Sequence, residues 1–193
     1  GDSRNKDDDY ATHQGETTLF YRIFPKLSVL GGGSYALTSR EKPVFSDSKQ
    51  YAGYGGFRYE VTEQLTGIVK IGALHKDFDA GDVDDTTQVY ASGEVQASFS
   101  ERSSLNLRLR RNIGETSLTD GTNAYGAYYV RTGFDAAMTY SCPALPNVLI
   151  LGDVGYIRET YPADENDRSD DRVELGVGID YKFLKYFTVG VKY

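Results

Sequence analysis

The sequence predicts an all-β protein, an antiparallel up-and-down transmembrane β-barrel, and three observations support this fold class. Apolar and polar residues alternate with a period of two in ten segments of the 193-residue chain, and no helical period competes with this pattern. Most segments are longer than ordinary strands and long enough to cross a bilayer when tilted. Short connectors alternate with long polar ones, which is the known asymmetry of membrane barrels.

The ten segments follow one another as strand, tight turn, strand and long acidic loop. The clearest of them reads "SLNLRLRRNI", in which leucines alternate with asparagine and arginine. A repeat of this kind predicts an antiparallel meander. The expected strands are 11–24, 27–40, 51–61, 65–77, 87–99, 104–113, 126–140, 148–161 and a final hairpin over 172–193. The expected long loops are 41–50, 78–86, 114–124 and 162–171.

Composition excludes several other classes of protein. The net charge of −7 argues against a nucleic-acid partner, because no basic block offsets the acidity. Cys142 is the only cysteine, so the chain has neither a disulfide framework nor the ligand spacing of a zinc site. The sequence contains no run of 18 apolar residues, so it predicts no transmembrane helix. No residue pattern in it predicts a cofactor.

The apolar face of each strand has two possible environments. In a soluble sandwich it packs inward, whereas in a membrane barrel it faces lipid. Aromatic residues gather near both ends of the expected strands, as the interfacial girdles of a membrane barrel do, and this favours the membrane. Those near the short turns are Tyr21, Phe24, Phe57, Tyr59, Phe99, Tyr140, Tyr181 and Phe183. Those near the long loops are Tyr35, Tyr51, Tyr128, Tyr156 and Tyr161.

The polar face is then expected to line the lumen. Its charges have both signs, so they either pair into a network that fills a narrow barrel or line a wet pore, depending on barrel width. The expected lumen-lining residues are Arg22, Arg58, Lys70, Glu94, Arg108, Arg110, Arg131, Asp135, Asp153, Glu174, Asp180 and Lys182.

Two parts of this polar face suggest solute contacts. Arg108 and Arg110, with Arg131 on the next strand, make the strongest positive patch and favour anionic solutes or acidic sugars. The alternative is that these arginines pair with Glu94, Asp135 and Asp153 for structural reasons. The expected lumen tyrosines offer a surface on which sugars stack, and they are Tyr54, Tyr90 and Tyr129.

The connector pattern bears on the completeness of the barrel. Ten strands joined in this way begin and end on the long-loop side, whereas barrels of this kind keep both termini on the short-turn side. Residues 1–10 are expected to be the remnant of a loop, and Tyr193 lies at the wrong end of its strand for a closing aromatic. We therefore expect residues 1–193 to be one barrel domain or segment, within a parent barrel of about twelve strands or more. The alternative is a complete ten-stranded barrel.

The acidic loop 77–85 and the histidine before it are the candidates for metal binding and catalysis. Carboxylates at Asp79, Asp82, Asp84 and Asp85 are of the type that binds Ca²⁺ or Mg²⁺, although their spacing is not that of an EF-hand and the alternative is a solvated loop. His75 suggests a hydrolytic site at the rim, for which a solvated histidine is the default alternative. We expect no catalytic residue.

The hairpin pattern "R-x-D-D-x…Y-x-F…Y-F-T-V-G-V-K-Y", with an acidic loop containing "DRSDDR", resembles the putative β-barrel porin type 2 family. The resemblance covers nearly the whole chain. It implies an outer-membrane barrel of the kind found in exopolysaccharide and capsule export systems. The family has no motif in this sequence from which functional residues carry over.

These observations together predict a porin-like channel in the outer membrane of a Gram-negative-type bacterium, passing polar solutes or exported polysaccharide. The alternative is a non-conducting structural or binding barrel that acts through its long acidic loops within a larger assembly. The expected partners are outer-membrane lipid and lipopolysaccharide, a polysaccharide or other polar solute, and other envelope proteins.

Overall fold

The computed structural model describes residues 10–40, 47–79, 85–115, 128–162, 168–184 and 187–193. Within these residues every regular element is a strand. No described helix is long and apolar enough to cross a membrane. The strands are β1 Tyr10–Phe24, β2 Leu27–Arg40, β3 Ser48–Thr62, β4 Leu65–Phe78, β5 Thr86–Ser100, β6 Ser103–Glu115, β7 Tyr128–Ser141, β8 Val148–Thr160, β9 Ser169–Leu184 and β10 Phe187–Lys192.

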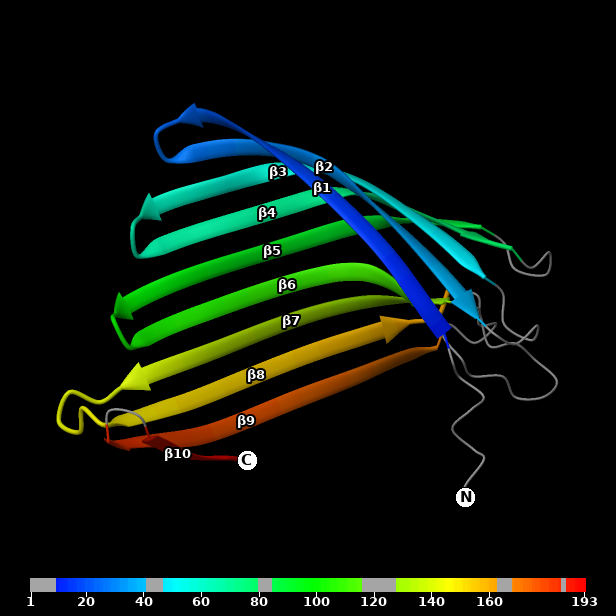
Figure 1. Ribbon diagram of the computed structural model, residues 1–193. Helices are drawn as coiled ribbons and strands as arrows, with labels where there is room; N and C mark the ends of the chain where they lie inside the picture. The colour runs from blue at the N-terminus through cyan, green and yellow to red at the C-terminus, as the bar shows by residue number, and fades with distance from the viewer. Residues whose placement is uncertain (1–9, 41–46, 80–84, 116–127, 163–167, 185–186) are drawn as a thin grey trace, which may run out of the picture.

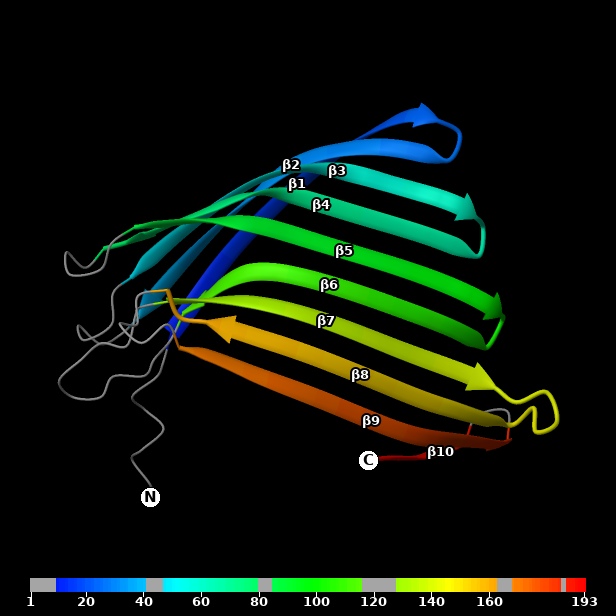
Figure 2. The same ribbon diagram turned by 180° about the vertical axis from the view of Figure 1, so that it is seen from behind.

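The ten strands form one antiparallel sheet in chain order, from β1 to β10 (Figure 1). This confirms the predicted all-β, up-and-down fold class. The described sheet is open, since β1 pairs only with β2 and β10 only with β9. Figure 2 shows the sheet from behind, with the short turns gathered at one end.

Several strands extend further toward the long loops than the sequence predicts. β3 begins at Ser48 rather than at residue 51, and β9 begins at Ser169 rather than at residue 172. Tyr10, which was expected to belong to the loop remnant 1–10, is the first residue of β1; residues 1–9 lie outside the described part. The ladder continues through these polar residues because backbone hydrogen bonding does not depend on an apolar side chain.

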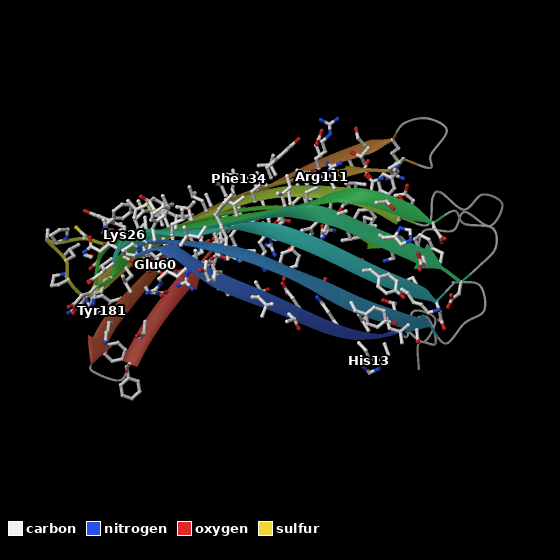
Figure 3. All side chains as sticks on the ribbon, turned by 90° about the horizontal axis from the view of Figure 1, so that it is seen from above. His13, Lys26, Glu60, Arg111, Phe134 and Tyr181 are labelled. Atoms are coloured by element: carbon white, nitrogen blue, oxygen red, sulfur yellow. The ribbon has the colours of Figure 1, made fainter. Side chains whose placement is uncertain are left out.

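The period-two pattern separates the side chains into two faces, which we call the convex and the concave face. On the convex face apolar side chains are exposed, and Leu19 and Leu175 show 73% and 76% of their surface. Figure 3 shows Phe134 and Arg111 on the same, outer side of the curved sheet. On the concave face, curvature brings distant strands together, so that Lys70 of β4 reaches Glu16 of β1 with an Nζ–Oε1 distance of 3.0 Å.

One hairpin leaves the curved wall near the long loops. β6 pairs with β5 only as far as Arg111 opposite Ala91, whereas β6 and β7 stay paired up to Glu115 opposite Tyr128. We call residues 112–115 and 128–131 the in-turned hairpin end. It passes over the concave face of the neighbouring strands, because Tyr128 contacts Phe78 of β4 and Thr86 of β5 there.

This arrangement corrects one expectation from the sequence. Tyr128 has the alternation of a lipid-facing residue and was expected in the girdle near the long loops. Instead it packs inside the curve of the sheet, and Val130, on the same face of β7, is only 3% exposed. Alternation assigns a residue to a face of its own strand, but a hairpin that folds inward turns that face against the opposite wall.

Candidate channel lining and constriction

The predicted lumen-lining residues share the concave face. Within one register row, neighbouring strands from β5 to β7 place Glu94, Arg108 and Asp135 side by side, so the sign of the charge alternates from strand to strand. Opposite charges on adjacent strands attract each other across the ladder. All the predicted positions have this face in common: Arg22, Arg58, Lys70, Glu94, Arg108, Arg110, Arg131, Asp135, Asp153, Glu174, Asp180 and Lys182.

The ion pairs of this wall agree only in part with the predicted pairing. Arg110 pairs with Asp135 at 3.2 Å, as the structural alternative predicted. Glu94 instead accepts a hydrogen bond from the Asn106 amide at 2.9 Å. Asp153 instead pairs with a lysine of β10, Lys192, at 2.7 Å. These pairs are solvent-exposed, so each contributes at most about 1 kcal/mol to stability.

Part of the charge on the wall is unpaired. Among the residues that the structure describes, Arg22, Arg108, Asp180 and Lys182 form no ion pair. Arg108 donates from Nε to the Asn106 Oδ1 at 3.0 Å, and this leaves the rest of its guanidinium available. Arg108 is exposed on the concave face, and it lines a hollow together with Arg110, Asp135 and Glu174.

A polar cluster occupies the concave face of β1, β3 and β4. The Tyr54 hydroxyl donates to Glu16 and lies 2.6 Å from the Thr18 hydroxyl. Lys70 lies over the Tyr54 ring, with Nζ 4.6 Å from the ring centroid, and Tyr90 packs beside it at 5.5 Å between centroids. Tyr54 is therefore only 7% exposed and offers no free ring for a sugar, contrary to the expectation from the sequence.

The in-turned hairpin end builds an apolar core across the concave side. Ile113 of β6 packs with Ala52 of β3 and Leu74 of β4, and Leu74 is 2% exposed. Tyr90 and Tyr128 border this core. Two stacked layers of sheet therefore exist near the long loops, where the sequence predicted a single wall around a lumen. We call Ala52, Leu74, Tyr90, Ile113 and Tyr128 the constriction core.

Contacts around Tyr128 hold the two layers together. Its hydroxyl lies 3.0 Å from the Thr86 hydroxyl, and its ring stacks on Phe78 with 6.2 Å between centroids. On β6, a side-chain Cβ at Gly114 would overlap the Tyr129 ring, so the glycine gives this tyrosine room to lie flat across the strand. Glycine at such a position permits close packing that any other residue prevents.

A second network lies beside the in-turned hairpin end. Arg131 donates to Glu159 Oε1 from Nε at 2.8 Å and from Nη2 at 2.5 Å, and from Nη2 to the Tyr129 hydroxyl at 3.1 Å. The Tyr161 hydroxyl donates to Glu159 Oε2 at 3.4 Å. Burial, followed by the charges of Glu159 and Asp170, raises the pKa of Tyr161, so this phenol stays protonated.

Glu159 as the partner of Arg131 and Lys192 as the partner of Asp153 were not predicted from the sequence. Both have the polar alternation of the concave face. Pairing Arg131 with Glu159 required the register between β7 and β8, which the sequence pattern leaves unspecified. Lys192 requires the short β10 to lie next to β9.

The candidates for catalysis and metal binding lie elsewhere. His75 is on the convex face, with Nδ1 2.8 Å from the Thr87 hydroxyl and Nε2 2.5 Å from Asp77. Asp79 pairs with Lys49 at 3.1 Å, and Asp85 accepts from a backbone amide. Asp82 and Asp84 lie outside the described residues. Within the described ranges, no group of three potential metal ligands converges.

The long antiparallel strands, the exposed apolar convex face and the charged concave face together define the wall of a membrane-embedded β-barrel. Within that class, a family model described as Putative beta-barrel porin 2 matches residues 3–193. The chain therefore belongs to this family, as its resemblance predicted. A porin family is one of channel proteins rather than of enzymes. None of the curated proteins matches the sequence.

Proposed function

We propose that the protein forms a channel for polar solutes, including exported polysaccharide, across the outer membrane of a Gram-negative-type bacterium. The observation that carries this proposal is the polar concave face. It presents charges of both signs over consecutive strands, opposite a convex face that is apolar and exposed. A lumen of this composition keeps water and binds polar solutes weakly enough to release them.

The balance of charge supports uncharged polar solutes over strongly ionic ones. The described residues contain as many lysines and arginines as aspartates and glutamates, so the net charge of −7 resides in the remaining segments of the chain. In the middle of the concave wall, Glu94 and Asp135 balance Arg108 and Arg110, so this part exerts little net attraction on either sign of ion. Arg108, like Arg22, Asp180 and Lys182, forms no ion pair among the described residues.

Single-channel recording in a planar bilayer tests this function. We expect stable conductance steps that added oligosaccharide reduces by occupying the lumen. Arg108→Glu is expected to shift the reversal potential toward cation selectivity, because it places an anion on the lining. Arg111→Glu is the matched control, since Arg111 is on the same strand but on the convex face. An inserted protein without conductance would contradict the channel.

The alternative function is a non-conducting barrel that acts through its acidic loops within a larger assembly of envelope proteins. The constriction core favours this alternative, because it places packed side chains across the concave side near the long loops. The same recording separates the two functions. If only variants that disrupt the constriction core conduct, the unmodified barrel is closed and its function resides in its loops and their partners.

A further inference from the structure

We propose that Arg111 and Arg158 bind the phosphate groups of an anionic lipid headgroup in the leaflet on the long-loop side. Guanidinium groups suit this role because their planar donors match phosphate oxygens in pairs. The site faces away from the proposed lumen. It therefore extends beyond the proposed function, and its failure would leave the channel unaffected.

The site lies on one register row of the convex face. Arg111 of β6 is opposite Thr132 of β7, and Thr132 is opposite Arg158 of β8. On β6 and β7 this is the last row on the outer surface, because the next residues of the same faces, Ile113 and Val130, are buried inside the curve. Figure 3 shows Arg111 on the outer side with Phe134, nearer to the long loops.

The arginines are incompletely neutralised by the protein. Arg111 donates to the Thr132 hydroxyl at 3.0 Å and forms no ion pair among the described residues. Among the described residues, the ion pairing of Arg158 is limited to a long contact with Asp171, 3.9 Å from Nε to Oδ1. The Tyr156 hydroxyl, which Arg158 also contacts, donates to that carboxylate at 2.7 Å. An arginine on a lipid-facing surface is unfavourable in hydrocarbon but tolerated at the interface, where headgroup phosphates supply the counter-charge.

The surroundings favour a lipid over a free anion. The next row toward the membrane centre contains Leu109, Phe134 and Tyr156, all exposed on the convex face. Two strand spacings separate the arginines, about 10 Å between their Cα atoms, so both side chains reach one headgroup. An anchored headgroup keeps its acyl chains against this apolar row, whereas a free phosphate gains nothing from it.

Lipid retention measured by native mass spectrometry tests the proposal. The detergent-extracted protein is incubated with diphosphoryl lipid A and with its dephosphorylated form, and we expect only the first to be retained. Each arginine near a membrane surface contributes about a fivefold change in binding. Arg111→Gln is therefore expected to weaken retention about fivefold, and the double variant with Arg158→Gln about 25-fold.

Arg108→Gln is the matched control, because it removes an unpaired arginine from the concave face of the same strand. Arg111→Lys keeps the charge but loses the paired planar donors, so it is expected to weaken retention less than Arg111→Gln does. Equal retention of the dephosphorylated lipid, or an equal loss in Arg108→Gln, would overturn the proposal. Displacement of the lipid by equimolar inorganic phosphate would identify a site for free anions instead. If the double variant does not fold, the single variant Arg111→Gln and the comparison of the two lipids on the unmodified protein still test whether the arginines bind the lipid phosphates.

Discussion

The two ends of the concave face differ in how they are built. Near the short turns, the face is a single layer in which charged side chains such as Arg58 and Glu60 pair in exposed positions. Near the long loops, the in-turned hairpin end adds a second layer, and Leu74 and Glu159 are buried there. The same polar and apolar alternation therefore produces an open wall at one end and a packed core at the other.

The difference shows that curvature, and not composition alone, decides whether a residue of this sheet meets water, lipid or protein. Where β6 stays paired with β5, its outward residues are exposed. Where it separates beyond Arg111, its outward residue Ile113 becomes part of a core. The predictions that follow test the contrast between the two ends, beginning with the largest effect.

Truncation of Leu74 is expected to have the largest effect. Leu74→Ala leaves a cavity between two layers and should lower the free energy of unfolding by about 2–4 kcal/mol. Leu151→Ala, the matched change on the concave face nearer the short turns, should lower it by less than about 1 kcal/mol. Urea unfolding in lipid vesicles, followed by circular dichroism and gel mobility, measures both. Equal effects would show that no second layer exists.

Breaking the Arg131–Glu159 pair is expected to have the next largest effect. Arg131→Ala leaves the nearly buried Glu159 carboxylate without its partner and should destabilise the barrel by about 2 kcal/mol. Arg110→Ala breaks an exposed pair, and its effect should stay below about 1 kcal/mol. The same unfolding assay compares the two variants. A larger loss of stability in Arg110→Ala than in Arg131→Ala would contradict the assignment of Arg131 and Glu159 to a buried network.

Filling Gly114 should have a smaller effect. Gly114→Ala introduces a Cβ into the space of the Tyr129 ring and should destabilise the barrel by about 1–2 kcal/mol as the ring moves. Gly93→Ala is the control, because nothing lies within 4 Å of the added Cβ there. Melting temperatures of the two variants in the same detergent provide the comparison. An unchanged Gly114→Ala protein would place Tyr129 elsewhere.

Removal of one hydroxyl should have the smallest effect. Tyr128→Phe keeps the ring on Phe78 but loses the hydrogen bond to Thr86, which contributes about 1 kcal/mol. A weaker attachment of the in-turned hairpin end should also appear as more frequent fluctuations of conductance in single-channel records. Tyr35→Phe, on the convex face, is the control and should leave the conductance steady.

The sequence by itself determined the class of this protein, the order of the strands that the structure describes and the shared face of the twelve charged residues predicted to line the lumen. It did so because a strand has a period of two, and a repeated pattern of turns leaves only one simple connection between neighbours. It did not predict that Tyr128 is inside, that Tyr54 is covered, or that Glu159 binds Arg131. Those facts depend on contacts between strands far apart in the chain and on register and curvature. Alternation carries no information on register or curvature, because it describes each strand alone.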